Sequence, residues 1–528
     1  MHRLLLTALL ATSTLAAHAA TITVNTLEAE DNQDGDCSLR EAMLSADLDQ
    51  AFDACTAGNG ADVIEIAVTG QIELPFGFRF STDVTLRGPG SDQLTLVDAA
   101  TSQTLQVQGS TVRFEGFTIA GDGTSSVADG AFLLFAGADV TMEDVVIRDF
   151  VSGSQGGAIL AESSQLTLGR CQLLRNTSTT SNGGGLYALD TNVTIEQSLF
   201  QGNTAGGNGG GLYFSNNVEL VVDASTFIGN EATAGGGLFL NSGTVRVQRS
   251  TVADNRARTF GGGISTNVSA LTLTSLTVTG NTADSDADGT GDGGGISGFS
   301  GVTITNSVVA GNQDLGGDVA PDLAVGDTWT VGPTNFIGDG RGAERAFSPG
   351  APNASGQFVG TEAAPLDPLL GTLADNGGET PTRLPLATSP LLDAGTCDGN
   401  ADQRGFQRPA DGGGSGPIGC DIGAVEANST LATALGQEAT GTFDLHAPSP
   451  NPAAGPVDLI YELRAASESA RLAVYDALGR EVAVLASGPR QAGTYRAELD
   501  ASRLAPGVYL VRLSDQTHHV TRPLTVVR

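Results

Sequence analysis

The sequence predicts an all-β protein built as a solenoid, because three features point to repeated, stacked coils. Glycine triplets begin at Gly183, Gly209, Gly235, Gly261 and Gly293, so the first four recur every 26 residues and the last step is 32. Short aliphatic runs alternate with polar residues between the triplets, and an Asn closes each unit. A fixed period of this size marks supersecondary units that stack on their neighbours.

The runs between the triplets have the pattern of β-strands. The clearest alternation occurs in Val193–Ile195, Val245–Val247, Leu271–Leu273 and Val302–Ile304. A period of two places one side chain inward and the next outward, and each run is too short to bury its apolar face alone. Stacking would put equivalent residues about 4.8 Å apart. We expect one inward ladder of residues spaced by 26, formed by Ile195, Val221, Val247 and Leu273.

The Asn that ends each unit predicts a corner of the coil. The series is Asn176, Asn203, Asn230, Asn255, Asn281 and Asn312. Asn tolerates left-handed φ at a bend, and its amide can hydrogen-bond to the Asn of the next unit. The glycine triplets would serve the opposite corner, with positive φ and crowded backbones. Steps of 27 and 25 residues on either side of Asn230 indicate one extra residue near Val222 that is corrected within a coil.

Coils of this size, with aliphatic residues inside and Asn at a corner, resemble the right-handed parallel β-helix. The resemblance implies one solenoid over residues 76–330, which includes weaker units such as Gln155–Gly157. An open solenoid end exposes unpaired strand edges and core residues, so both ends need caps.

The first 19 residues have the features of a secretory signal peptide. Arg3 is followed by the apolar stretch Leu4–Leu15 and the small-x-small site Ala17–Ala19. No later segment is apolar over about 20 residues, so we expect no transmembrane segment in the mature chain. Secretion permits disulfides. Two local bridges, Cys37–Cys55 and Cys397–Cys420, with Cys171 as a buried thiol, are the simplest arrangement, although spacing leaves other pairings open.

Residues 37–42, Cys-Ser-Leu-Arg-Glu-Ala, look like the CSLREA motif at the start of many secreted bacterial β-helix proteins. Ser38 and Glu41 have the spacing of a capping box, and the apolar residues after them share one helix face. We therefore expect residues 20–75 to form an N-terminal cap with a short helix over the first coil.

Residues 331–427 carry an ordered series of short motifs, among them Asn376–Thr380, Ser389–Gly395 and Asp421–Glu426. The series is similar to the closing segment of the same kind of surface β-helix, sometimes called a choice-of-anchor domain. The resemblance implies a segment that closes the solenoid, with its Arg and Asp residues paired to fix irregular loops. A binding site built from those residues is the alternative.

After an Ala, Ser and Thr-rich linker over 428–442, residues 443–528 resemble the C-terminal sorting domain of the type IX secretion system. The similar motifs are Pro450–Pro452, Val474–Asp476, Leu478–Val482 and Gly507–Tyr509. Alternating residues in this part independently predict a small antiparallel β-sandwich. The resemblance implies that the type IX machinery is a partner, that the protein crosses the outer membrane of a Gram-negative bacterium and that this module is then cleaved. The body would be attached to the cell surface or released. An ordinary immunoglobulin-like adhesion module is the alternative.

Charge and composition exclude several functions. The chain has 26 basic residues, all of them Arg, against 59 acidic ones, and its net charge of −33 argues against nucleic acid as a partner. The body between the signal peptide and residue 442 contains no His and no Lys. Catalysis by Ser-His-Asp or Cys-His sets, His-based metal sites and Schiff-base chemistry are therefore excluded there.

One acidic insertion predicts a metal site. The 32-residue unit contains Asp284, Asp286, Asp288 and Asp292, with Gly289 and Gly291 between them. Carboxylates at alternate positions followed by Gly suit Ca²⁺, which takes several oxygen ligands from one loop. The loop lacks flanking helices and has Gly295 where an EF-hand has its bidentate Glu. An exposed acidic loop without a metal is the alternative.

These features favour a surface-displayed β-helix protein without enzymatic activity, which binds an extracellular polysaccharide or another cell-surface ligand. The alternative is a carbohydrate-active enzyme, either a polysaccharide lyase or a glycoside hydrolase. Only Tyr187, Tyr213 and Trp329 offer polar-tipped aromatic platforms along the body, fewer than an extended sugar groove usually has. The richest polar coil carries Arg246, Arg249, Arg256 and Arg258, for which a solvated face is the simpler interpretation.

Overall fold

The protein is an all-β chain in two compact units, residues 1–431 and 432–528, each described here by itself. The computed structural model describes residues 19–99, 105–124, 126–127, 130–216, 218–268, 270–299, 301–317, 319–327, 329–410, 419–427, 443–445, 453, 455–463, 467–475, 480–505, 507–514 and 519–526. The predicted signal peptide, except for its last residue, the linker 428–442 and the motif Pro450–Pro452 lie outside these residues.

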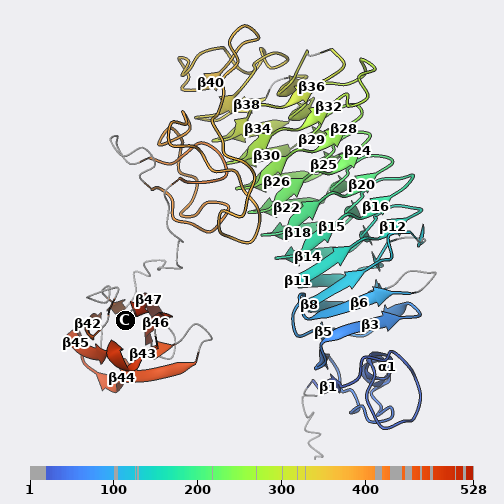
Figure 1. Ribbon diagram of the computed structural model, residues 1–528, viewed down its shortest axis with the longest axis vertical. Helices are drawn as coiled ribbons and strands as arrows, with labels where there is room; N and C mark the ends of the chain where they lie inside the picture. Colours follow the sequence, from blue (N-terminus) through green and yellow to red (C-terminus); the bar gives the residue numbers. More distant parts are fainter. Residues whose placement is uncertain are drawn as a thin grey trace, which may run out of the picture. The chain divides into compact units, whose positions relative to one another are not determined.

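The first unit is a solenoid of parallel strands in three sheets (Figure 1). Sheet A has two strands in most coils, separated by a bend. Its described strands are β1 (Thr21–Val24), β2 (Asp62–Ile66), β3 (Gly70–Leu74), β5 (Val84–Arg87), β6 (Leu94–Asp98), β8 (Thr111–Ala120), β11 (Asp139–Arg148), β14 (Gln165–Gly169), β15 (Gln172–Leu174), β18 (Asn192–Glu196), β19 (Leu199–Gln201), β22 (Glu219–Asp223), β23 (Thr226–Ile228), β26 (Thr244–Gln248), β27 (Thr251–Ala253), β30 (Ala270–Thr274), β31 (Thr277–Thr279), β34 (Val302–Thr305), β35 (Val308–Val309), β38 (Thr330–Val331), β39 (Phe336–Ile337) and β40 (Phe358–Val359).

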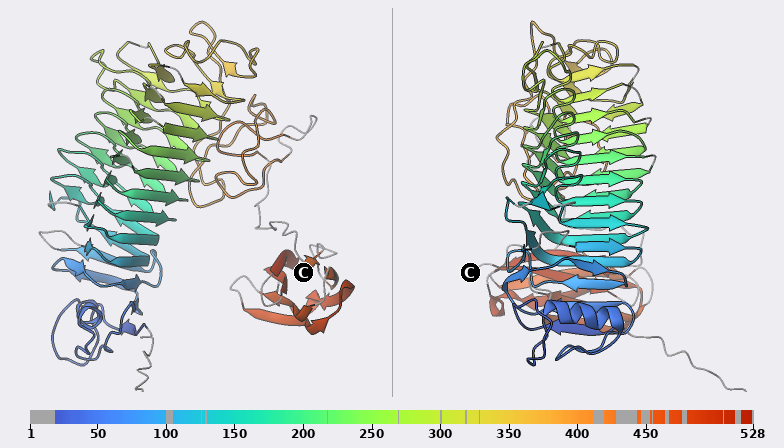
Figure 2. Two further views of the ribbon diagram at one scale, coloured as in Figure 1. Left: turned by 180° about the vertical axis from the view of Figure 1, so that it is seen from behind. Right: turned by 90° about the vertical axis from the view of Figure 1, so that its right-hand side faces the viewer.

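Sheets B and C complete each coil (Figure 2). Sheet B consists of β4 (Phe78–Phe80), β7 (Leu105–Gln108), β10 (Phe132–Phe135), β13 (Ile159–Glu162), β17 (Leu186–Leu189), β21 (Leu212–Ser215), β25 (Leu238–Leu240), β29 (Ile264–Thr266), β33 (Ile296–Gly298) and β37 (Leu323–Val325). Sheet C consists of the short strands β9 (Ser126–Val127), β12 (Val151–Ser152), β16 (Thr177–Ser178), β20 (Thr204–Ala205), β24 (Glu231–Ala232), β28 (Arg256–Ala257), β32 (Thr282–Ala283) and β36 (Gln313–Asp314).

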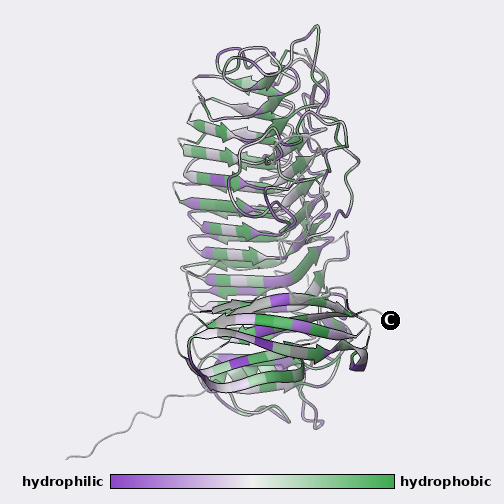
Figure 3. Ribbon diagram, turned by 90° about the vertical axis from the view of Figure 1, so that its left-hand side faces the viewer, coloured by the Kyte–Doolittle hydropathy of each residue, from purple (hydrophilic) through white to green (hydrophobic). Residues whose placement is uncertain are grey.

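The aliphatic interior predicted from the repeat is confirmed, with one correction to its register. Hydrophobic and hydrophilic residues alternate along the strands (Figure 3), and the inward side chains form one continuous core. Ile195 pairs with Val222, which pairs with Val247 and then Leu273, and all four are fully buried. The assignment of Val221 to this ladder was wrong, because Val221 pairs with Thr194 and points outward. The extra residue of that unit precedes Val222 and so shifts its strand by one position.

The Asn series forms a buried hydrogen-bonded ladder, as predicted. Asn230 accepts at Oδ1 from the backbone N–H of Asn203 at 2.9 Å and from its Nδ2 at 3.0 Å. Nδ2 of Asn230 donates in turn to Asn255 Oδ1 at 2.9 Å and to the carbonyl of Phe200 at 2.9 Å. Oriented amide chains polarise one another, and every buried group here has a partner. The ladder continues from Asn312 to a carboxylate, Asp322.

Left-handed backbone lies one residue before each ladder Asn, so the prediction that Asn itself adopts it was wrong. The preceding residues are Arg175, Gly202, Gly229, Asp254, Gly280 and Gly311, with φ between 53° and 70°. Positive φ at the glycine triplets is confirmed for the first glycine of each, for example 71° at Gly209. At Gly210 a Cβ would collide with the carbonyl of Gly236 in the next coil. Only glycine therefore allows the coils to approach at this corner.

The N-terminal end of the stack carries the predicted helix. Ser38 is the N-cap of helix α1 (Leu39–Leu48), and Ser38 and Glu41 form both bonds of the capping box. The disulfide Cys37–Cys55 closes the loop around it, and Arg40 lies over the ring of Phe76 at 4.2 Å. Strands β1, β2 and β3 pair within sheet A, so the sheet already begins before residue 76. The helix thus lies beside the first strand pairs of the stack.

Residues 361–410 and 419–427, which we call the side segment, run back along the outside of the solenoid (Figures 1 and 2). Thr251 donates to Gln403 Oε1 at 2.6 Å, and Thr277 Oγ1 accepts from the backbone of Ala424 at 3.1 Å. Leu391 and Ile422 of the segment pack on the second strands of sheet A. The segment therefore covers the outer face of those strands. The C-terminal end of the core is filled by Phe347 and other apolar residues between 329 and 359.

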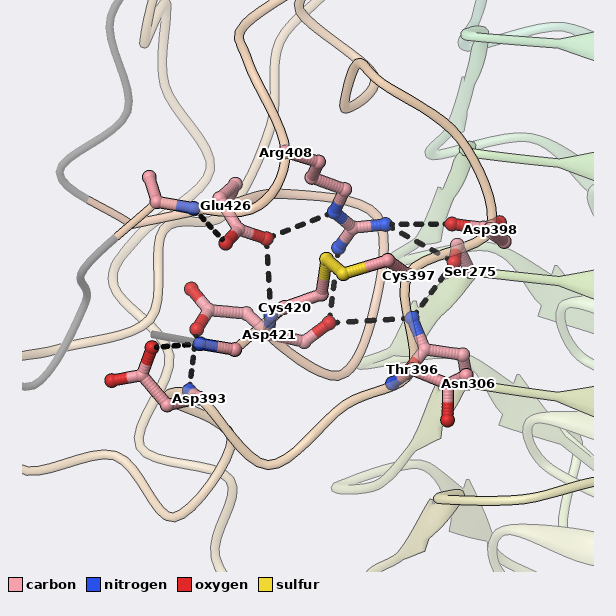
Figure 4. Close-up of a disulfide and its surroundings, with 12 residues drawn as sticks. Ser275, Asn306, Asp393, Thr396, Cys397, Asp398, Arg408, Cys420, Asp421 and Glu426 are labelled. Atoms are coloured by element: carbon pink, nitrogen blue, oxygen red, sulfur yellow. Dashed lines mark hydrogen bonds and ion pairs between the residues drawn. A yellow bond between two sulfur atoms is a disulfide. The ribbon is translucent and has the colours of Figure 1, made fainter. Parts of the chain in front are cut away.

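A buried ionic network fixes the side segment, and the predicted second disulfide, Cys397–Cys420, is present within it (Figure 4). The fully buried Arg408 pairs with Glu426 at 2.9 Å and donates to Ser275 of the solenoid at 3.1 Å. Removing one member of such a pair leaves an uncompensated buried charge. Charged residues of this closing segment thus fix its irregular loops through ion pairs and hydrogen bonds, as predicted. Cys171 is the remaining, buried thiol.

The second unit is a small antiparallel β-sandwich. One sheet contains β41 (Phe443–Leu445), β42 (Pro456–Leu463) and β45 (Gly493–Asp500). The other contains β43 (Ser467–Tyr475), β44 (Glu481–Arg490), β46 (Gly507–Ser514) and β47 (His519–Val526), and a 3₁₀ turn covers Ala501–Arg503. Its core includes Tyr461, Leu472, Val511 and Leu524.

We predict that Asn230→Ala destabilises the protein by about 2–4 kcal/mol, because the buried donors of Asn203 lose their acceptor. Chemical denaturation followed by circular dichroism would measure the change. Asn241→Ala is the matched control, since Asn241 is only half-buried and its amide donates to Ser215 at 3.2 Å. Equal effects of the two variants would contradict a ladder on which the stack depends.

Candidate functional site

The acidic insertion is the strongest candidate for a ligand site in the solenoid. It leaves the stack after β32 and returns before Gly293. Carboxylate oxygens of Asp284, Asp286 and Asp288 all lie within 4.8 Å of one another. Asp284 is fully buried, whereas Asp286 and Asp288 are exposed. The structure therefore gathers three of the four predicted metal ligands into one cluster.

Backbone hydrogen bonds shape this loop from the inside. The Asp284 carboxylate accepts from the N–H groups of Asp288 at 3.0 Å and Gly289 at 2.9 Å. Asp292, the fourth predicted ligand, lies at the end of the loop and is half-buried. Burial raises the pKa of Asp292, and the charges of Asp314 and Asp284 raise it further. The Ca²⁺ expectation stays a prediction at this point, because hydrogen bonds within an acidic loop also form without a metal.

The four Arg residues of the polar coil do not form one cluster. Arg246 lies on β26 and Arg256 on β28, in different sheets, and both are exposed. Arg249 forms an ion pair with Asp223 of the preceding coil. Other carboxylates on the outside of sheet A are paired similarly, as in Glu143 with Arg170 at 2.7 Å. The coil thus matches the solvated face expected for it rather than a binding pocket.

The three aromatic residues predicted as platforms, Tyr187, Tyr213 and Trp329, do not form an open stacking surface for a sugar. Tyr187 stacks on Tyr213 with ring centroids 5.0 Å apart, and Tyr213 stacks on Phe239 at 5.4 Å. These rings cover one another's faces along the solenoid, so they offer edges rather than free faces for a sugar to stack on. Trp329 is only 7% exposed and belongs to the interior core, so its assignment as a platform was wrong.

Among the described residues, a pocket of about 350 Å³ lies near the C-terminal end of the solenoid. Its lining residues are Val331, Gly332, Pro333, Ala346, Phe347, Ser348, Asn353, Ser355 and Gln357. The polar groups of Gln357 and Asn353 are already bonded to neighbouring backbone and side chains. The pocket offers no titratable side chain that could serve as an acid or base.

Burial or a neighbouring carboxyl group accounts for the raised pKa values of three further carboxylates. Burial raises the pKa of Asp322 to about 7, although three N–H donors from Asn312 and Asp339 hold the carboxylate. Burial also raises the pKa of Asp421, to about 6, inside the side segment. The pKa of Glu30 rises to about 7 through a hydrogen bond with Glu28 and through burial. These groups lie in the ladder, the side segment and the N-terminal cap, apart from the pocket.

Comparison with known families now identifies the two units. A model described as "Right handed beta helix region" matches residues 129–313, and one described as "Secretion system C-terminal sorting domain" matches residues 449–527. The chain is a secreted right-handed β-helix protein with a type IX sorting domain. Neither match covers Cys37–Ala42, so the CSLREA resemblance stays a prediction. No protein with a curated description gives a match to the chain.

The sorting domain indicates secretion through the type IX machinery and attachment at the surface of a bacterial cell. The described part of this β-helix protein contains no helix of the length and apolarity needed to span a membrane. Sequence reasoning missed Asp322, which ends the Asn ladder, and Phe239, which stacks on Tyr213. Asp322 lies only ten residues after Asn312, the last Asn of the ladder, so the 26-residue spacing does not predict it. It reaches Asn312 through a loop that the repeat does not contain.

We predict that Asp322 makes stability fall as pH rises from about 4 to about 7. The pKa of Asp322 is higher in the folded chain than the ordinary value of 3.8. Between these two pKa values the folded state binds more protons than the unfolded state, so the free energy of unfolding falls as the pH rises. The free energy of unfolding of the parent should fall between pH 5 and pH 8. In Asp322→Asn this fall should be smaller by about 1–3 kcal/mol. Denaturation midpoints at both pH values would measure it, and an unchanged slope would contradict the assignment.

Proposed function

We propose that the β-helix is a non-catalytic binding scaffold displayed outside the cell, and that its contact surface is the outer face of the first strands of sheet A. The observation that carries this proposal is the asymmetry between the two outer faces of the sheet. The side segment buries the face of the second strands, including Thr226, Thr251 and Thr277. The first-strand face keeps its outward side chains exposed or half-buried.

The exposed face presents side chains in a regular column. Outward residues pair in register from coil to coil, so that they repeat at the strand spacing of about 4.8 Å. The column consists of Thr141, Thr167, Thr194, Val221, Arg246, Thr272 and Thr303. Five of these seven residues are Thr, with Val221 and Arg246 between them, and hydroxyl groups repeated along a rigid array suit an extended polymer with repeated polar groups, such as an extracellular polysaccharide. A rigid surface also loses little conformational entropy on binding.

The composition and the ion pairs support binding rather than catalysis. The sequence of the body supplies no His or Lys, and its Asp223 and Glu143 are engaged with Arg side chains. A glycoside hydrolase needs two carboxyl groups about 5–10 Å apart across the scissile bond. The pocket near Gln357 contains neither Asp nor Glu among its lining residues. A carbohydrate-active enzyme is therefore the weaker candidate, and product assays on acidic polysaccharides would test it directly.

We predict that the secreted protein binds extracellular polysaccharide or whole cells through this column. The triple variant T167R/T194R/T272R should reduce binding at least about tenfold, since bulky Arg side chains replace three of the five Thr hydroxyl groups in the column. T177R/T204R on sheet C is the matched control and should bind as the parent does, because that face is not part of the proposed surface. Binding in pull-down or surface plasmon resonance would be compared.

Equal binding by parent, triple variant and control would contradict the choice of face. Release of unsaturated or shortened sugars by the parent protein would contradict the non-catalytic assignment itself.

A further inference from the structure

The pocket near Gln357 lies where the first strands of sheet A end. The last of these strands is β38, and it pairs with β34 so that Thr330 lies opposite Thr303. Thr330 is exposed, so it continues the outward column by one coil. The next three residues, 331–333, all line the pocket. The column therefore leads directly to the pocket wall.

A second contact joins the pocket to the same face. A Cβ at Gly332 would collide with Oγ1 of Thr305, so the backbone of this wall residue rests on an outward side chain of β34. Thr305 pairs in register with Thr274 of the preceding coil, beside the column. The pocket thus adjoins the exposed face of the first strands through two neighbouring rows of outward residues.

Hydrogen bonds fix the walls of the pocket. Gln357 is 4% exposed, and its Nε2 donates to the carbonyl of Gly332 at 3.0 Å. In the loop before it, Asn353 donates from Nδ2 to the carbonyl of Ser348 at 2.6 Å and accepts at Oδ1 from the backbone N–H of Ser355 at 2.9 Å. Because the walls are preformed, a ligand would bind without the cost of ordering these side chains.

The lining of the pocket carries no charge. It includes no Asp, Glu, Arg or His, although the chain as a whole has 59 acidic and 26 basic residues. An ionised ligand would lose its hydration here without gaining a counter-charge. The hydroxyl groups of Ser348 and Ser355 form no hydrogen bond within the part of the chain that the structure describes, whereas Val331, Ala346 and Phe347 supply an apolar wall. Uncharged rings with several hydroxyl groups match this combination.

We propose that the pocket binds one neutral sugar unit, either the end or a side branch of the polysaccharide that lies along the first strands. The inference rests on the proposed function for its choice of polymer. The cavity of about 350 Å³ is near the lower end of the range of roughly 300–1,000 Å³ that is usual for small-ligand pockets, so it holds one or two sugar rings rather than a longer chain. The column would thus bind the length of the polymer, and the pocket would select a neutral unit at one point of it.

The test titrates the full secreted protein with glucose, galactose, mannose, xylose and N-acetylglucosamine, and separately with glucuronate and galacturonate, by calorimetry and saturation-transfer NMR. We expect saturable binding of at least one neutral sugar in the millimolar range, and binding of the uronates that is at least about tenfold weaker. Ser355→Trp should lower the affinity for the neutral sugar at least about tenfold, because the indole would fill the pocket.

Ala354→Trp is the matched control, since Ala354 is exposed in the same turn but does not line the pocket. It should bind the sugar as the parent does. The inference is overturned if the parent binds no neutral sugar saturably, if it binds the uronates equally well, or if Ser355→Trp keeps the parent's affinity.

The column variant T167R/T194R/T272R separates this inference from the proposed function. It should lose polysaccharide binding but keep the parent's affinity for the single sugar. If it keeps polysaccharide binding while Ser355→Trp loses sugar binding, the proposed contact face is wrong and the pocket assignment stands.

Discussion

The solenoid depends on the parallel backbone pairing of successive coils in one fixed register. Each short strand gains hydrogen bonds from both neighbours and buries its inward side chain on the equivalent residue above and below. A one-residue slip would turn every inward aliphatic residue to solvent. The Asn ladder supports that register, because its side chains bond only when the corners of neighbouring coils align. Glycine triplets permit the close approach at the other corner.

The register also explains how the two strands of each coil in sheet A come to present two distinct outer faces. When the same outward strand position carries a similar residue in successive coils, these side chains stack into a long column. On the second strands this column carries Thr251 and Thr277, which the side segment covers through hydrogen bonds. On the first strands the column stays open. Buried ion pairs such as Arg408 with Glu426 hold the segment in place and so preserve the difference between the faces.

Periodic features of the sequence were sufficient to predict the solenoid, the Asn ladder, the capping box and the antiparallel module. The solenoid and the Asn ladder depend on a spacing that the chain repeats many times, whereas the capping box and the antiparallel module each depend on a local pattern that occurs once. The side segment could be recognised but not placed, because its contacts join residues more than 100 positions apart, as in Thr251 with Gln403. Its path along the outside of the stack depends on those distant pairs, which a local pattern does not reveal.

The errors have a similar physical origin. Val221 was assigned inward because strict 26-residue spacing ignores the residue inserted before Val222, and the strand pairing absorbs that residue at once. Trp329 was expected outside because Trp has a polar tip, yet the end of the core had room for it. Three loop carboxylates that lie close together were predicted from their spacing, whereas Asp292, the fourth predicted ligand, lies outside that cluster.

The register can be tested directly with engineered disulfides between adjacent coils. Thr194 pairs with Val221, so a T194C/V221C protein should form the cross-link on mild oxidation, since paired Cα atoms of neighbouring strands lie within disulfide range. T194C/L220C should stay reduced, because Leu220 points into the core beside Val193. Cross-linking of T194C/L220C in place of T194C/V221C would show that the coils stack in another register.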